Sequence, residues 1–231
     1  MKILCISDHI DPLVYTNTIK DRFGDIDMIL SAGDLPMDYL DFVVSSLNKP
    51  LLFVFGNHDN NHFKAVPESL NPFGMVTDFP PSAGIIHVGS RVRYEEGLIC
   101  AGLGGSRLYN NGENQYTELQ MKCEMAKLIP RLLLNRLIRG RFLDVLLTHA
   151  SPFGIHDKPD RCHQGFKCFL WFMRVFKPKY LIHGHIHLYD SSEVRTTRYH
   201  NTLVLNAYSH YIIDTDEYQY TTKEDQTTDR H

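Results

Sequence analysis

Short apolar runs that end abruptly at Gly and polar residues are the feature that most constrains the fold of this chain. The first half contains three such runs, at residues 2–7, 28–32 and 51–55, and the segment 37–47 between the last two has apolar residues at helical spacing. Strands that alternate with helices in this way build a mostly parallel sheet. Because open α/β folds place their sites in loops at the carboxyl ends of strands, we expect the functional residues there.

The second half has a different pattern. Three apolar runs at 84–88, 92–94 and 98–101 are closely spaced by Gly and polar turns, which predicts antiparallel strands or hairpins. Residues 117–141 carry apolar residues at helical intervals, and Pro130 should kink or divide that helix. The remaining predicted elements are a strand at 142–148, an aromatic helix at 165–176, a strand at 179–183 and closing antiparallel strands at 203–207 and 211–213.

Length and composition predict one domain over residues 1–214, followed by a polar C-terminal tail at 215–231. The net charge of -3, with Lys and Arg scattered, argues against a nucleic-acid partner. The five cysteines are odd in number and lack Cys-x-x-Cys spacing, which favours a reducing, cytoplasmic location. We expect neither a signal peptide nor a membrane partner, because the chain opens directly as a strand and lacks a long apolar run. The sequence leaves homo-oligomerisation open.

The loops that follow the predicted strands carry carboxylate, amide and imidazole side chains. In chain order these are Asp8, Asp34, Asn57-His58-Asp59, His149, and His185 with His187. A mixed set of oxygen and nitrogen ligands suits borderline divalent metals such as Mn, Fe, Zn or Co. A carboxylate such as that of Asp34 can bridge two ions about 3.5 to 4 Å apart, so we expect two divalent ions.

A paired metal site of this kind favours phosphoester hydrolysis. Such a site turns a bridging water into hydroxide, neutralises phosphoryl oxygens and supports in-line attack on phosphorus. His58 is the candidate acid for the leaving group, and Asp59 could orient its imidazole. The sequence therefore predicts a phosphodiesterase or phosphomonoesterase that acts on a small phosphorylated substrate.

With these motifs in this order, the chain resembles the calcineurin-like metallophosphoesterases. Four of the five motif blocks of that family match, between Asp8 and His187. The resemblance implies a four-layer α/β/β/α sandwich with mixed sheets, a dinuclear site at the carboxyl ends of the strands, and His58 as the leaving-group acid. The ligand sets that it implies are Asp8, Asp34 and His187 for one ion, and Asp34, Asn57, His149 and His185 for the other.

The first motif block departs from the family pattern of Asp-x-His. Here the segment is Asp8-His9-Ile10-Asp11, so Ile10, which cannot bind a metal, stands where the family has a histidine. Asp11 or a rotated His9 could replace the missing ligand, and Asp11 would shift the preference of the site toward Mn or Mg. Without a replacement, the first ion would be held weakly.

Two further residues are candidate substrate contacts. Arg107 follows a Gly-rich segment that could cradle a phosphate or simply form a tight turn, and His163 lies in the loop after His149. Two other functions compete with hydrolysis: a non-catalytic scaffold that keeps this fold, as in the phosphoesterase-like subunit of retromer, and a structural protein with one metal. Retention of Asn57 and His58 argues against a scaffold, whereas Ile10 argues mildly for one.

Overall fold

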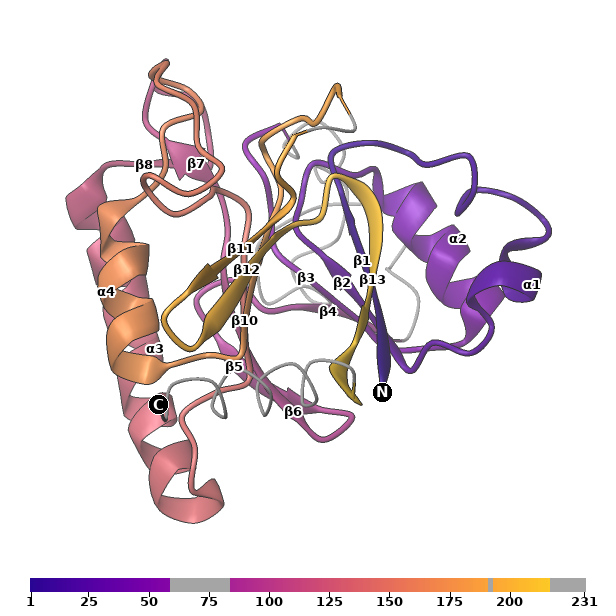
Figure 1. Cartoon of the computed structure of the whole chain (residues 1–231), viewed down its shortest axis with the longest axis horizontal. Coiled ribbons are helices and arrows are strands. Elements are labelled where there is room, and N and C mark those ends of the chain that lie inside the picture. Colours follow the sequence, from indigo (N-terminus) through magenta and orange to yellow (C-terminus); the bar gives the residue numbers. More distant parts are fainter. Residues whose placement is uncertain (59–83, 191–192, 217–231) are drawn as a thin grey trace, which may run out of the picture.

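The protein forms two mixed β-sheets packed face to face, with helices on both outer sides (Figure 1). The computed structural model describes residues 1–58, 84–190 and 193–216. Asp59 and most of the predicted tail lie outside the described residues, and the single-domain boundary stays a prediction. The expected four-layer α/β/β/α sandwich is confirmed.

The first sheet has the strand order β13-β1-β2-β3-β4 and the second has the order β11-β12-β10-β9-β6-β5. The strands of the first sheet, in that order, are Ser209–Asp214, Lys2–Ser7, Met28–Ser31, Leu51–Phe53 and Ile85–His87. Those of the second are Thr196–Tyr199, Thr202–Asn206, Tyr180–His183, Val145–Thr148, Leu98–Leu103 and Val92–Glu95. A small parallel pair, β7 (Ser106–Arg107) and β8 (Gln115–Tyr116), lies apart from both sheets.

The strands are apolar on both faces because each sheet is covered on both sides. In β1, Ile3 and Cys5 belong to the core between the two sheets, whereas Leu4 and Ile6 pack under the helices of the first sheet. This alternation follows from the two-residue period of a strand, and burial of both faces is typical of parallel sheets. The continuous apolar runs in the sequence are therefore strands of covered sheets.

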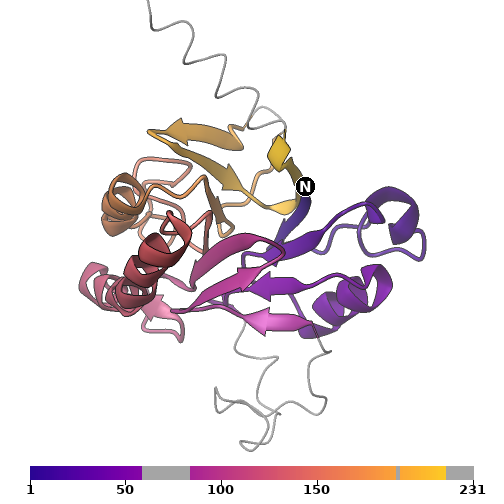
Figure 2. The same ribbon diagram turned by 90° about the horizontal axis from the view of Figure 1, so that it is seen from below.

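Helices α1 (Ile19–Phe23) and α2 (Met37–Leu47) cover the first sheet, and α3 (Glu118–Arg139) and α4 (Lys167–Phe176) cover the second. Figure 2 shows the two helical layers on opposite sides of the strands. None of the helices in the described ranges combines the length and the apolar character that a membrane crossing needs.

The predicted division of the helix at Pro130 is wrong, because one continuous helix spans Glu118–Arg139, whereas a kink at Pro130 stays a prediction. A proline in a helix removes one backbone hydrogen bond and crowds the preceding turn. Here the buried side chains of Met125 and Leu132, on either side of Pro130, pack into the same apolar cluster. Tertiary packing therefore stabilises the helix on both sides of Pro130.

Two strand pairings also differ from expectation. The strands β5 and β6 form the expected antiparallel hairpin, but β4 pairs in parallel with β3 in the other sheet. The strand β13 runs antiparallel to β1 and β12 runs antiparallel to β11, as expected, but β12 also runs parallel to β10 on its other side. Local turn signals cannot show which sheet a strand joins, because that choice depends on long-range packing.

Candidate metal centre

The candidate ligands lie at one edge of the sandwich because they follow the carboxyl ends of strands from both sheets. Asp8 and Asp34 follow β1 and β2, and His149 and His185 follow β9 and β10. Asp8, Asp34 and His185 have φ angles of 62°, 56° and 65°. Non-glycine residues seldom adopt this left-handed conformation, which is strained and clusters at functional sites. These three ligands therefore sit at sharp turns that closely follow their strands.

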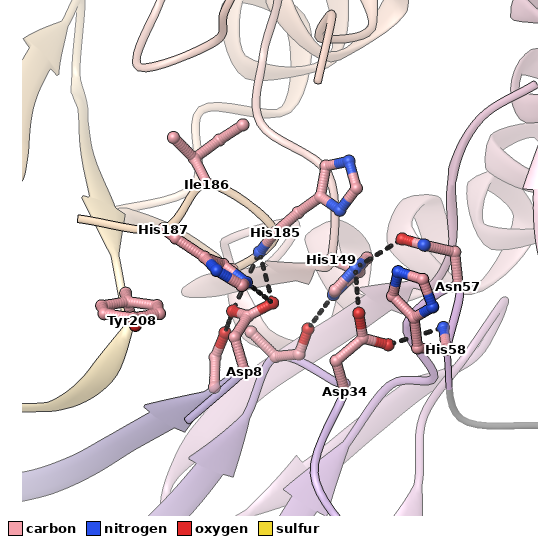
Figure 3. Close-up of polar contacts among 12 residues, drawn as sticks. Asp8, Asp34, Asn57, His58, His149, His185, Ile186, His187 and Tyr208 are labelled. Atoms are coloured by element: carbon pink, nitrogen blue, oxygen red, sulfur yellow. Dashed lines mark hydrogen bonds and ion pairs between the residues drawn. The ribbon is translucent and has the colours of Figure 1, made fainter. Parts of the chain in front are cut away.

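His149 lies at the centre of this group and is fully buried. Its Nδ1 is 2.7 Å from the carbonyl oxygen of Ala32, to which it donates, and this contact fixes the orientation of the ring. Its Nε2 faces two oxygens, at 3.0 Å from Oδ1 of Asn57 and 3.4 Å from Oδ2 of Asp34 (Figure 3). Three potential ligand atoms from both sheets thus converge at one point.

The charges of Asp34 and His149 are coupled. Burial alone would lower the pKa of His149, but the Asp34 carboxylate raises it to about 9. Burial likewise opposes ionisation of Asp34, yet the charge and hydrogen bond of His149 lower its pKa to about 2. The imidazolium proton therefore lies among oxygens that suit a cation, and a divalent ion would replace this proton.

His185 completes the group from the second sheet. A ligand atom of His185 lies within 4.8 Å of ligand atoms of Asp34 and His149. Its Nε2 is 2.8 Å from the carbonyl oxygen of Cys162, which assigns the proton to Nε2 and leaves Nδ1 as the potential ligand. Burial and the neighbouring His149 charge lower its pKa to about 3, so the ring is neutral as a metal ligand must be.

Asp8 and His187 form a second pair beside the first group. The backbone N–H of His185 donates to both oxygens of Asp8, at 3.0 and 2.9 Å, and Ser7 Oγ also donates to this carboxylate. Burial raises the pKa of Asp8 to about 6. Nε2 of His187 lies 3.9 Å from Oδ1 of Asp8, and its Nδ1 lies 3.1 Å from the hydroxyl of Tyr189.

The two candidate replacements for the missing first-block histidine have other partners. The Asp11 carboxylate accepts hydrogen bonds from Ser209 Oγ at 2.5 Å and from His210 Nδ1, both on β13. The ring of His9 stacks against Tyr208, whose ring lies 5.0 Å from that of His187. Replacement by Asp11 or His9 therefore stays a prediction, and each would first have to release these contacts.

The predicted catalytic and substrate residues differ in position. His58 is exposed, and its backbone N–H donates to Oδ1 of Asp34 at 2.8 Å, so its side chain starts beside the ligand group (Figure 3). The ring of His163 lies 5.2 Å from that of His185 and its Nδ1 contacts Asp160. The Arg107 guanidinium is paired with Glu118 at 2.7 Å, and its contact with substrate stays a prediction.

Several groups that hold the ligands had no signal in the sequence. Tyr109 accepts a hydrogen bond from Nδ2 of Asn57 at 3.3 Å, which orients the amide so that its oxygen faces His149. The carbonyls of Ala32 and Cys162 orient the two histidines. Every residue has a backbone carbonyl, so residue identity could not reveal these contacts. The Tyr189 contact was accessible in principle, since it lies two residues after His187.

The comparison with family models shows to which family the chain belongs. The model of the calcineurin-like phosphoesterases matches residues 1–189, which include every candidate ligand. The chain belongs to this family. As a calcineurin-like phosphoesterase it is a metal-dependent phosphoester hydrolase.

Solved structures agree with the fold of this phosphoesterase. One superposes with a TM-score of 0.62 at 15% identity, and a protein from Thermus thermophilus superposes with 0.59 at 13%; each match covers 94% of this chain and 95% of the other. A phosphopantetheinyl hydrolase from Mycobacterium tuberculosis aligns at 14% identity over 91% of this chain and 89% of its own, with a TM-score of 0.43. A comparison with curated protein sequences finds no match.

Proposed function

We propose that this phosphoesterase hydrolyses a small phosphorylated substrate with Asp34, Asn57, His149 and His185 as the ligands of one divalent ion. The observation that carries this proposal is the convergence of Asp34, His149 and His185 ligand atoms within 4.8 Å, at the edge shared by both sheets. When bound, divalent ions acidify water and neutralise phosphoryl oxygens, which is the chemistry that ester hydrolysis needs. Mn, Fe, Zn and Co all suit this donor set.

The residues around this centre have separate roles in the proposal. Ala32 and Cys162 hold the two imidazoles through backbone carbonyls, so that each histidine presents one fixed nitrogen. The exposed ring of His58 protonates the leaving-group oxygen, a task for which imidazole suits neutral pH. Asp59, proposed to orient that imidazole, lies outside the described residues.

We further propose that the two metal positions have unequal affinities. The second position would have the four ligands named above, whereas the first has Asp8, Asp34 and His187 and lacks the histidine replaced by Ile10. Fewer ligands give a weaker site, and protonation of Asp8 near pH 6 weakens it further. After dialysis, the protein should retain one equivalent of metal and should bind a second equivalent only at higher metal concentration. Metal analysis measures both values. Two equivalents of equal affinity would contradict this asymmetry.

Hydrolysis of p-nitrophenyl phosphate and bis-p-nitrophenyl phosphate with added Mn²⁺ tests the activity. We expect His58→Ala to lower kcat by about 100-fold, since general acid catalysis typically contributes that much. Asn57→Ala should lower metal affinity as well as activity. The exposed His200→Ala, on the turn between β11 and β12, is the matched control and should behave as wild type. The ratio of the two rates separates monoester from diester preference.

Metal content must be measured in the same samples. If the wild-type protein binds metal but cleaves neither ester, the scaffold alternative replaces the enzymatic proposal. Equal activity of wild type and His58→Ala would instead remove only the role given to His58.

A further inference from the structure

The outward side of α3 has an apolar surface that the fold does not cover. The inward side chains of this helix pack into the core; they are Met121, Met125, Leu128 and Leu132. The opposite side also carries large apolar residues, with exposed fractions between 40% and 83%; they are Leu119, Leu133, Leu134, Leu137 and Ile138. A surface helix ordinarily has polar residues there, so α3 has two apolar sides.

A groove lies between the same helix and α4. The space between α3 and α4 has a volume of about 510 Å³, and its lining includes Met125, Ala126, Ile129 and Trp171. Trp171 is 44% exposed, and Val175, one turn further along α4, is 40% exposed. The two helices form the outer layer on this side of the molecule (Figure 2). We call the groove and the outward residues of α3 the α3–α4 surface.

The two helices that carry the α3–α4 surface have mostly positive charges. The sequences of α3 and α4 contain seven Lys and Arg residues and two Glu residues, although the whole chain has a net charge of -3. Both glutamates are already engaged: Glu118 accepts from Arg107 and Cys168 N, and Glu124 accepts from Lys127 and Ser90. The exposed cations Lys122, Arg131 and Arg174 therefore set the local field.

We propose that the α3–α4 surface binds an acidic amphipathic helix of a partner protein. Its apolar residues would cover Trp171 and the outward leucines, and its carboxylates would meet the flanking cations, as in other helix-in-groove complexes. A second copy of this chain fits less well, because antiparallel packing of two α3 helices would bring Lys122 of one copy to Arg136 and Arg139 of the other. A lipid surface would leave the floor of the concave groove uncovered.

Trp171 is the single tryptophan of the sequence, so its emission reports on the groove directly. The probe is a Trp-free helical peptide of about 18 residues, about 27 Å long, with Leu on one face and Glu on the other. We expect a saturable blue shift that weakens as salt is raised, because screening reduces attraction between exposed charges. The same peptide with Lys in place of Glu should give no shift.

Leu137→Glu and Arg131→Glu should each weaken the binding by about tenfold or more, with unchanged thermal stability because both side chains are exposed. Lys20→Glu on α1, at the other side of the molecule, is the control and should leave the affinity within twofold. Ester hydrolysis should be unaffected by all three substitutions, so this test is independent of the proposed activity.

Three outcomes would overturn the proposal. The first is equal binding of the Lys peptide, or binding that the two α3 substitutions leave unchanged. The second is a blue shift with vesicles of phosphatidylserine and phosphatidylcholine but none with the acidic peptide, which would assign the surface to a membrane. The third is concentration-dependent dimerisation that Leu137→Glu abolishes, which would assign it to a second copy.

Discussion

At the residue scale, two motif glycines make room for the ligands. A Cβ atom on Gly56 would collide with the Asp34 carboxylate and the ring of His149, and one on Gly184 would collide with Ser7 and Asp8. The glycine before Asn57 and the glycine before His185 are therefore required by close packing of the polar side chains. The placement of these two glycines in the motifs therefore follows from the close packing at the metal centre.

Gly56→Ala should consequently abolish tight metal binding. The added methyl group displaces Asp34 or His149, and we expect a loss of at least about tenfold in affinity by calorimetry, since a change of about 1.4 kcal/mol in binding free energy has that effect. Gly97→Ala is the control: Gly97 has a φ of 82° but its Cβ would meet no atom within 4 Å. It should lower stability by about 1 kcal/mol and leave metal affinity intact. Normal metal binding by Gly56→Ala would contradict the collision.

The pKa of His149 predicts a pH dependence for the metal-free protein. Its pKa is raised from 6.5 to about 9 by Asp34, so the paired form stabilises the fold fully below about pH 6.5 and this contribution is lost as pH rises through about 9. Melting temperature in EDTA should therefore fall between about pH 7 and about pH 9.5. In His149→Gln this decline should be smaller. An identical decline in both proteins would refute the assignment to His149.

At the element scale, α3 contains an internal proline, and its N-terminal cap and its packed inward side stabilise the helix. Thr117 accepts from the backbone N–H of Gln120, whose side chain in turn accepts from the Thr117 N–H. This capping box fixes the start of the helix, and Gly140, with a φ of 73°, ends it. Pro130 is exposed and is absent from the apolar cluster under the helix, so that cluster does not require its ring.

Pro130→Ala should therefore stabilise the protein. Alanine restores a backbone hydrogen bond, and after allowance for the greater freedom of the unfolded chain we expect a gain of about 2 kcal/mol in the free energy of unfolding. Urea denaturation measures this value. Arg131→Ala at the neighbouring exposed position is the control and should change it by less than about 0.5 kcal/mol. A loss of stability in Pro130→Ala would mean that the helix depends on the proline.

At the scale of the whole molecule, the candidate metal centre joins the two sheets. Asp34 and Asn57 follow strands of the first sheet, and His149 and His185 follow strands of the second. An ion bound by all four would link the sheets at one edge. Binding to the folded state alone also raises stability by mass action.

Metal removal should accordingly lower the melting temperature of the entire domain. At a free metal concentration about one hundred times Kd, the expected stabilisation is about 2.7 kcal/mol. Calorimetry with excess metal and with EDTA measures the difference, and Asn57→Ala should reduce it. If metal leaves the melting temperature unchanged while metal analysis shows it bound, the ion does not bind selectively to the folded centre.

Local periodicity and side-chain chemistry are enough to predict most of the strands, the order of the motifs and the candidate ligand set. The tertiary structure was needed to show that α3 continues through Pro130, that β4 pairs in parallel with β3 and β12 with β10, and that Asp11 contacts Ser209 and His210. It also decided which backbone carbonyls orient the two buried histidines of the centre. These features depend on contacts between residues far apart in the chain, which local sequence patterns do not encode.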